Sequence, residues 1–374
     1  MTVPFRGSPR PTIGVEWELA LVGRGDLDLS NDAARLFDAV RSDHPERTAF
    51  VHQELLRNTV ELVTGVCDTV PEAMADLAAS LAAVRAAADP LGIDLICAGT
   101  HPFAQWDRQQ LPEGERYAEL ISRTQWWGRQ MLIWGVHVHV GVSRADRVFP
   151  ILGALLHQYP HLLALSASSP IWAGHDTGYA SNRAMMFQQL PTAGLPFHFD
   201  HWSEYEGFVR DQTVTGVIDH LNEIRWDIRP APHLGTIEVR VCDGVSTFAE
   251  LAGLTALIQC LVVHYDRRLD AGETLPWLPP WHVQENKWRA ARYGLDAEVI
   301  VAADNTERPV TEDLADLLDR LAPLAAELGC ADALAGLARI PERGASYQRQ
   351  RAVAGATGGD LRAVVASLVA ELGT

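Results

Sequence analysis

The amino-acid sequence predicts an α+β fold, in which a mainly antiparallel sheet carries helices on one face. Segments that alternate between apolar and polar residues, as strands do, dominate the first two-thirds of the 374 residues. Helical periodicity dominates the last third, from about residue 285. Strands and helices segregated in this way are typical of α+β proteins. No linker or internal repeat interrupts the chain, so we expect a single domain over residues 1–374 with a helix-rich C-terminal part.

Five segments have the pattern of β-strands. Residues 12–22 (TIGVEWELALV) and 58–66 (NTVELVTGV) alternate with a period of two. Residues 93–99 (IDLICAG) form a short apolar run that is typical of a buried strand. Residues 135–142 (GVHVHVGV) place four valines on one face, and residues 233–243 (HLGTIEVRVCD) alternate again.

Several helices have recognisable start signals. Thr69 and Glu72 form a capping box before an Ala/Leu-rich helix that runs to about residue 90, and Thr247 with Glu250 begins a second long helix. Residues 170–202 are rich in Gly, Pro, Asn and His, which predicts a long loop of the kind that is usually functional. Other helices are expected at about residues 31–41, 115–133, 146–167, 205–225, 285–303, 311–328, 331–338 and 359–372.

Composition limits the classes of function. The chain has 31 Lys and Arg against 48 Asp and Glu, and the resulting net charge of −17 repels DNA and anionic membranes. We therefore expect neither nucleic-acid nor membrane partners. The five cysteines are scattered without a CxxC pair, as is typical of reduced thiols in a cytoplasmic protein. A signal-peptide pattern and an apolar stretch long enough to span a membrane are both missing, so we expect a cytoplasmic location.

Four of the five predicted strands carry ionisable residues on one face, namely those at 12–22, 58–66, 135–142 and 233–243. Because side chains alternate along a strand, the apolar residues of each segment share one face and the ionisable residues share the other. A solvent-exposed face would explain this pattern in any single strand. The residues concerned are Glu16, Glu18, Glu61, His137, His139, Glu238, Arg240 and Cys242.

A metal site explains this face better than exposure to solvent. Solvent faces are usually rich in Lys, Thr, Ser and Gln, whereas these four strands carry carboxylates, His and Arg. Three or four converging carboxylates need a cation or several arginines to stay ionised. Carboxylate oxygens with a single imidazole suit Mg²⁺ or Mn²⁺.

The motifs on these strands resemble those of a known family. They are GVEWE (14–18), ELLRNTVEL (54–62), GVHVHVGV (135–142) and GTIEVRVCDG (235–244), with SNRAMMFQQLPTAGLP (181–196) and ENKWRAARYGLDA (285–297) in support. Together they resemble the glutamate–cysteine ligase family, specifically its second, carboxylate–amine ligase type, from about residue 10 to about residue 350. The resemblance implies one catalytic domain with a sheet curved into a funnel, as in glutamine synthetase, active-site residues on its inner face and helices outside. It also suggests a homodimer.

The resemblance assigns roles to individual residues. It implies that Arg240 lies near the transferred phosphoryl group and that Arg183 binds a substrate carboxylate. Lys287 and Arg292 are weaker candidates for contacts with nucleotide phosphates, because a solvated helix would show the same pattern. Mg²⁺ ions that bridge the phosphates of ATP would be held by Glu16, Glu18, Glu54, Glu61, His139 and Glu238. Since Glu54 stands seven residues before Glu61, we expect it in the loop before the strand, or before a bulge.

Other residues have ordinary explanations. His137 is expected to support the site rather than bind metal, and Cys242 to be a buried thiol. Trp126, Trp127 and Trp134 are expected in the core. The sequence has neither a Walker A motif nor a GxGxxG motif, so nucleotide binding is expected to depend on metal and arginine.

The function implied by the resemblance is ATP-dependent ligation of a carboxylate, that of glutamate, to an amine such as cysteine. A γ-glutamyl phosphate would form, and ADP and phosphate would be released. One alternative is a metal-dependent hydrolase built on the HVH of residues 137–139, although such hydrolases usually carry HxH on their first strand together with a metal-bridging lysine. Ligation of a different amine and a catalytically silent relative are further alternatives. Unused clustered carboxylates would cost stability, which argues against the last.

Overall fold

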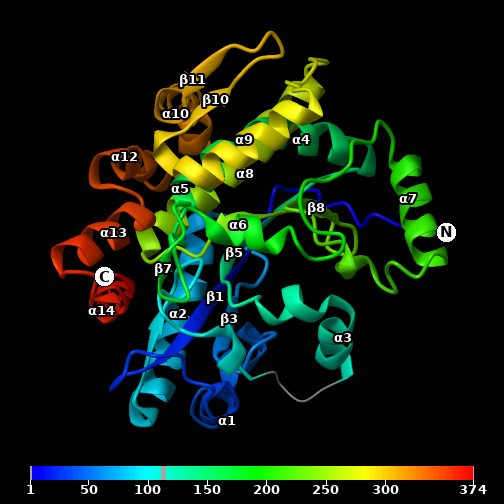
Figure 1. Ribbon diagram of the computed structural model, residues 1–374. Helices are drawn as coiled ribbons and strands as arrows, with labels where there is room; N and C mark the ends of the chain where they lie inside the picture. Colours follow the sequence, from blue (N-terminus) through cyan, green and yellow to red (C-terminus); the bar gives the residue numbers. More distant parts are fainter. Residues whose placement is uncertain (1, 111–114, 374) are drawn as a thin grey trace.

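The central element of the protein is a seven-stranded antiparallel sheet, seen in a computed structural model that describes residues 2–110 and 115–373 (Figure 1). Its strands are β1 (Ile13–Gly23), β2 (Val51–Gln53), β3 (Thr59–Val63), β4 (Ile93–Ile96), β5 (Gly135–Gly141), β8 (Ile228–Ala231) and β9 (Thr236–Asp243). The strand order is β2-β3-β1-β5-β9-β8, and β4 pairs with the C-terminal end of β1. All these pairs are antiparallel, so the predicted α+β class with a curved antiparallel sheet is confirmed.

Alternation along β1 gives the sheet two different faces. Trp17 and Leu19 are fully buried in the main hydrophobic core, together with apolar residues of β3, β5 and β9. Glu16 and Glu18 point to the opposite face, because neighbouring side chains of a strand point in opposite directions. Farther along that second face, Ala20 belongs to a smaller apolar cluster. One face of β1 is therefore apolar throughout, and the other is acidic at one end and apolar at the other.

Helices cover the apolar face of the sheet. Helices that contribute to the main core include α1 (Ala33–Asp43), α2 (Val70–Ala88), α4 (Ala145–His157), α5 (Tyr159–Ser166) and α8 (Phe248–Asp270). The capping box at the start of α2 is confirmed, since Thr69 accepts from the Glu72 N–H and Glu72 accepts from the Thr69 N–H. At α8 only half of the predicted box forms, because Thr247 caps the helix while Glu250 binds arginines of the C-terminal part.

One helix of the described residues, α8, is long and apolar enough to cross a membrane, which the sequence analysis did not anticipate. The bent pair of α4 and α5 would also qualify if it were counted as one span. Of the apolar window of α8, 78% is buried inside the protein, which is the environment of a core helix.

The C-terminal part is mainly helical, as predicted, but it also contains a small hairpin. Residues 285–303 were expected to form one helix, whereas α9 ends at Tyr293 and the chain continues into β10 (Glu298–Ile300) and β11 (Glu307–Pro309). The helices are α9 (Pro280–Tyr293), α10 (Val310–Glu327), α11 (Ala331–Gly336), α12 (Ile340–Arg343), α13 (Ser346–Ala356) and α14 (Leu361–Leu372). Helices α10, α12, α13 and α14 gather on one side of the molecule in Figure 1.

Helix α14 closes the apolar end of the second sheet face. Val365 and Leu368 of α14 pack in one cluster with Ala20 and Val22 of β1. The main chain of α14 is also tied to α2, because Arg85 donates a hydrogen bond to the carbonyl of residue 372 at 2.5 Å. Among the described residues, the acidic end of this face lies outside this apolar cluster.

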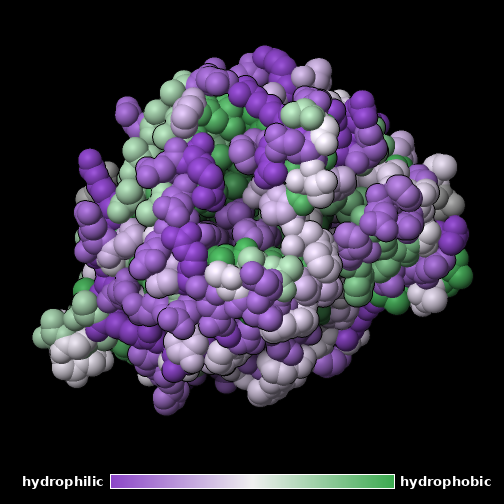
Figure 2. Space-filling view, turned by 90° about the horizontal axis from the view of Figure 1, so that it is seen from above, coloured by the Kyte–Doolittle hydropathy of each residue, from purple (hydrophilic) through white to green (hydrophobic). Residues whose placement is uncertain are grey.

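The segment between α5 and β8 contains more regular structure than the predicted loop of residues 170–202. It forms a short hairpin of β6 (Ile171–Trp172) and β7 (His175–Asp176), then α6 (Asn182–Phe187) and α7 (Trp202–Val214). Helices α7 and α3 (Glu115–Arg129) lie on the side of the molecule opposite the C-terminal helices (Figure 1). Viewed from above, the surface is mostly hydrophilic and is hollowed near its middle (Figure 2).

The three tryptophans predicted in the core have different environments. Trp134 is 1% exposed, and its indole N–H donates to the Thr59 hydroxyl at 2.8 Å, so this prediction is confirmed. Trp126 and Trp127 on α3 are 58% and 44% exposed, so the prediction for them is wrong. They lie on the outer side of a helix whose sequence alone did not show which side faces the core.

Candidate active site

Neighbouring strands bring the predicted acidic and imidazole side chains to one face of the sheet. In an antiparallel pair, residues directly opposite each other project to the same side. The opposed pairs are Glu18 with Glu61, Glu16 with His137, and His139 with Glu238. Since β5 alone separates β1 from β9, all six side chains belong to one continuous patch of the sheet.

A β-bulge in β9 determines the direction of Cys242. Val138 of β5 pairs with Val239, but Val136 pairs with Cys242, so two residues of β9 face one residue of β5 between these pairs. The extra residue reverses the alternation beyond it, and Cys242 joins Val136 in the main core. The expectation of a buried thiol is confirmed, whereas its predicted position on the face of Glu238 is wrong.

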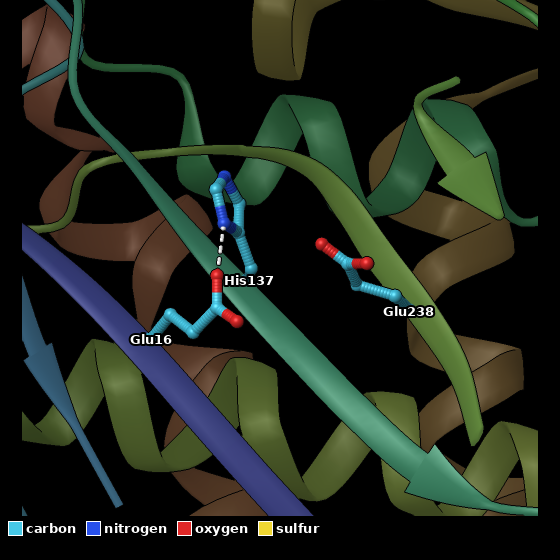
Figure 3. A group of neighbouring side chains, drawn as sticks. All are labelled: Glu16, His137 and Glu238. Atoms are coloured by element: carbon cyan, nitrogen blue, oxygen red, sulfur yellow. Dashed lines mark hydrogen bonds and ion pairs between the residues drawn. The ribbon is translucent and has the colours of Figure 1, made fainter. Parts of the chain in front are cut away.

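Glu16, His137 and Glu238 form a first group of potential metal ligands. Each offers one ligand atom, and these atoms all lie within 4.8 Å of one another. The three side chains come from three adjacent strands and converge on one space (Figure 3). His137 Nδ1 lies 2.8 Å from Glu16 Oε2.

Glu18, Glu61 and His137 form a second group, again with ligand atoms within 4.8 Å of one another. His137 therefore stands between two possible ion positions. The sequence analysis expected it only to support the site, and this geometry instead makes it a candidate ligand. The signal for this role was its position on the same strand face as His139.

His139, the predicted ligand, lies beside the first group. Its Nε2 is 3.1 Å from Glu16 Oε1 and 3.9 Å from Glu238 Oε2. Its Nδ1 is hydrogen-bonded to the Thr236 hydroxyl at 2.9 Å, a contact that orients the ring toward both carboxylates.

The two carboxylates of the first group are held ionised. Burial alone would raise the pKa of Glu16, but hydrogen bonds with both histidines of β5 outweigh it and hold that pKa well below the usual range. Burial opposes ionisation of Glu238 as well, and the guanidinium groups of Arg240 and Arg229 overcome it and lower the pKa.

For the carboxylates of the second group, nearby positive charge does not outweigh the effect of burial. Burial, followed by the negative charge of Glu54, raises the pKa of Glu18 to about 7. The same two causes raise the pKa of Glu61 well above its usual range. Glu54 itself lies between β2 and β3, where it was expected. Added positive charge would therefore favour the ionised form of both carboxyl groups.

The donor set fits a divalent cation with oxygen preference. Burial, and then the positive charge of Arg240, lower the pKa of His137 to about 4, so its imidazole is neutral at neutral pH, as a metal ligand must be. Carboxylates that outnumber imidazoles suit Mg²⁺ or Mn²⁺ better than zinc. The elevated pKa values of Glu18 and Glu61 are the electrostatic reason to expect a cation here.

Two arginines bind the carboxylate of Glu238. Arg229 of β8 donates from Nε at 2.6 Å and from Nη2 at 3.2 Å, and Arg240 donates to Oε1 from the other side. Arg229 was not predicted, because Pro230 and the short length of β8 hid this strand in the sequence.

Arg183 lies beside this cluster at the start of α6 and is 4% exposed. Its Nη1 donates to the carbonyl of Arg240 at 3.3 Å, and both guanidinium groups lie 5.9 Å from the ring of Phe187. Within the described part of the chain, the buried Nε atoms of Arg183 and Arg240 have no hydrogen-bond partner. Unpartnered buried donors next to an acidic site favour an anionic ligand, which would remove their desolvation cost.

Lys287 and Arg292 contact protein groups in this structure. Lys287 is 1% exposed, and its Nζ lies 2.7 Å from Asp227 Oδ2, which also accepts from the Tyr159 hydroxyl at 3.1 Å. Arg292 donates to the carbonyl of residue 178 and lies over the ring of Tyr179. Contacts of these two cations with nucleotide phosphates therefore stay a prediction.

Comparison with known sequences identifies the protein family to which this antiparallel sheet with a carboxylate-rich face belongs. The sequence pattern of glutamate–cysteine ligase family 2 matches residues 12–367. The chain belongs to this family. A protein of Rhodococcus jostii, provisionally named glutamate–cysteine ligase 2-2, is 68% identical over 374 residues, with full coverage of both chains. A protein of Mycobacterium tuberculosis with the provisional name glutamate–cysteine ligase 2 is 65% identical over 370 residues, 99% of this chain and 97% of its own.

Solved structures with low sequence identity share the fold. The glutamate–cysteine ligase of Francisella tularensis in complex with AMP has a TM-score of 0.68 at 14% identity, over 99% of this chain and 93% of its own. The bifunctional glutathione synthetase of Pasteurella multocida also has a TM-score of 0.68, at 13% identity, over 97% of this chain and 52% of its own. These likenesses confirm the predicted fold.

Proposed function

We propose that this protein is an ATP-dependent ligase that forms an amide bond between the γ-carboxylate of glutamate and an amine, with cysteine as the leading candidate. The observation that carries the proposal is the juxtaposition of two acidic groups that share His137 with the buried, unpartnered Nε donors of Arg183 and Arg240. Membership of the family supports a ligase. The Francisella tularensis enzyme, which has a similar fold and was solved in complex with AMP, supports a nucleotide substrate.

The acidic face would hold the metal ions. Mg²⁺, or Mn²⁺ in its place, would supply positive charge to the phosphates of ATP. The chain's own part is to fix the ligands on rigid strands, with His137 between the two groups. The residues proposed to hold the ions are Glu16, Glu18, Glu54, Glu61, His137, His139 and Glu238.

The arginines would act on the substrates. An oxygen of the glutamate γ-carboxylate forms a bond to the γ-phosphorus of ATP, and ADP leaves. The amine then attacks the acyl carbon, loses a proton, and phosphate leaves with the bridging oxygen. Arg240 would stabilise charge on the transferred group, and Arg183 would bind a substrate carboxylate through two hydrogen bonds. The chemistry calls for no covalent protein nucleophile.

Phosphate release provides the test. Purified protein with ATP, Mg²⁺ and glutamate should release phosphate only when a suitable amine is added, and a panel of amino acids and simple amines should single out the acceptor. Product analysis should show a γ-glutamyl amide. Tightly bound zinc with hydrolysis of an added amide would contradict the proposal and support the hydrolase alternative. We also propose that the reaction takes place in the cytoplasm, where all five buried cysteines would stay reduced.

A further inference from the structure

Hydrogen bonds connect the backbone of Arg183 with a buried carboxylate, that of Asp243, which the sequence analysis did not single out. Asp243 is the last residue of β9 and is completely buried. Its Oδ2 accepts hydrogen bonds from the Ser168 N–H at 3.0 Å and the Ser169 hydroxyl at 2.7 Å. Its Oδ1 accepts from the Ser181 hydroxyl at 2.8 Å. Asp243 therefore joins two separate segments to the strand that carries Glu238.

Ser169 and Ser181 connect Asp243 with the first turn of α6. A hydroxyl has one proton to donate, so a serine that donates to Asp243 turns its oxygen lone pairs toward other donors. Ser169 Oγ accepts from the N–H of Arg183 at 3.0 Å, and Ser181 Oγ accepts from the N–H of Ala184 at 3.2 Å. Both N–H groups belong to the first turn of α6, where no intrahelical partner exists.

The guanidinium of Arg183 is held at its other end by the sheet. It lies so close to Gly135 that a Cβ on this residue would be 2.1 Å from Nη2, closer than real atoms approach. The N–H of Gly135 donates to Glu18 Oε2 at 2.5 Å, so the same residue contacts the acidic site. The side chain of Arg183 therefore has little freedom once its backbone is fixed.

We propose that Asp243 is a positioning residue: through Ser169 and Ser181 it sets the first turn of α6 and so places the guanidinium of Arg183 at the substrate carboxylate. The inference rests on the proposed function, in which Arg183 binds that carboxylate. Asp243→Asn keeps the volume but replaces one acceptor oxygen with a donor. The N–H of Ser168 can only donate, so the new amide nitrogen must face Ser181, whose hydroxyl could then accept from residue 243 but no longer donate to it.

A double-mutant cycle tests whether Asp243 acts through Arg183. Glutamate affinity is measured by calorimetry for Asp243→Asn, Arg183→Gln and the double variant, each with Mg-ADP present. We expect Asp243→Asn to weaken glutamate binding about 10- to 100-fold, since the loss of a hydrogen bond to a charged group changes an equilibrium constant by about this factor. The double variant should bind no more weakly than Arg183→Gln alone. Effects that multiply would overturn the proposal.

Two buried serines provide a matched pair in case Asp243→Asn does not fold. Ser169→Ala removes the bridge between Asp243 and the N–H of Arg183. Ser166→Ala removes a hydroxyl that accepts from the N–H of Asp243 at 3.2 Å and donates to the carbonyl of Leu162 in its own helix. We expect weaker glutamate binding for Ser169→Ala and unchanged binding for Ser166→Ala. Equal affinities in the two variants would overturn the proposal.

A crystal structure of Ser169→Ala separates this inference from the proposed function. Arg183 should leave its place against Gly135 and lose its contact with the carbonyl of Arg240, and the Ser166→Ala structure should retain both. An unmoved Arg183 would overturn the inference whatever the substrate is. A wild-type protein that does not bind glutamate would refute the proposed function alone, because the structural comparison would still decide the role of Asp243.

Discussion

Glu18→Gln is expected to make the metal-free protein more stable at pH 8 and to impair its use of Mg-ATP. Burial and the charge of Glu54 raise the pKa of Glu18 to about 7, against 4.5 for an ordinary glutamate. The folded state therefore binds the proton more tightly than the unfolded state does. The stability that this proton provides is complete below about pH 4.5 and is lost as the pH rises through about 7.

The size of the effect follows from the difference between the two pKa values. A shift of 7 − 4.5 = 2.5 units, at about 1.36 kcal/mol per unit, gives an upper value of roughly 3 kcal/mol at pH 8. Glutamine avoids this loss because it stays neutral at every pH. Its carbonyl can still accept the hydrogen bond from the N–H of Gly135. We expect a net stabilisation of about 1–3 kcal/mol at pH 8, and almost none at pH 4.5.

Thermal unfolding in EDTA at both pH values measures this difference. At pH 8 the Tm of Glu18→Gln should exceed that of the wild type, and added Mg²⁺ should raise the Tm of the wild type more than that of the variant. Glu298→Gln, at an exposed position in β10, is the matched control and should change neither value. A lower Tm of Glu18→Gln in EDTA at pH 8 would refute the view that Glu18 is an uncompensated charge in the metal-free site.

Three other predictions test the chemistry and the buried cation. Arg240→Ala should lower kcat by about 10²- to 10³-fold with a smaller change in KM, because its charge matters most as the phosphoryl group is transferred; a change confined to KM would reassign it to ground-state binding. With ¹⁸O in the γ-carboxylate of glutamate, mass spectrometry should find one label in the released phosphate and ADP as the other product, and unlabelled phosphate or AMP would contradict an acyl-phosphate intermediate. Lys287→Met should destabilise the protein by about 3–5 kcal/mol in urea unfolding, because it leaves the carboxylate of Asp227 buried without its cation. An unchanged midpoint with weaker ATP binding would instead support a phosphate contact for Lys287.

The acidic face could be predicted from the sequence because regular strands obey a strict alternation. Glu16 and Glu18 had to share a face once Trp17 and Leu19 faced the core, and the cross-strand register then placed Glu61 and His137 beside them. The register itself cannot be derived from alternation, although the valines of β5 limit it to steps of two residues.

The features that the sequence analysis did not predict depend on an irregularity in a strand or on contacts with residues far away in the sequence. The bulge in β9 moved Cys242 to the core, and no residue type near it distinguishes a bulged strand from a regular one. Glu250 has the spacing of a capping box but binds Arg343 and Arg349, which lie far away in the sequence. Nothing in the sequence separates Asp243 from any other aspartate at the end of a strand, because its serine partners come from two other segments.

The contact of α14 with β1 also has a consequence for how the protein folds. Ala20 and Val22 are synthesised long before Val365 and Leu368, which cover them. Contacts between such distant segments slow folding, since the entropy of closing a long loop must be overcome before the contact forms. Until then, an apolar strand surface is available to other chains, and exposed surfaces of this kind promote aggregation. Nascent chains that lack α14 should therefore depend on chaperones even though they already contain every acidic residue of the site.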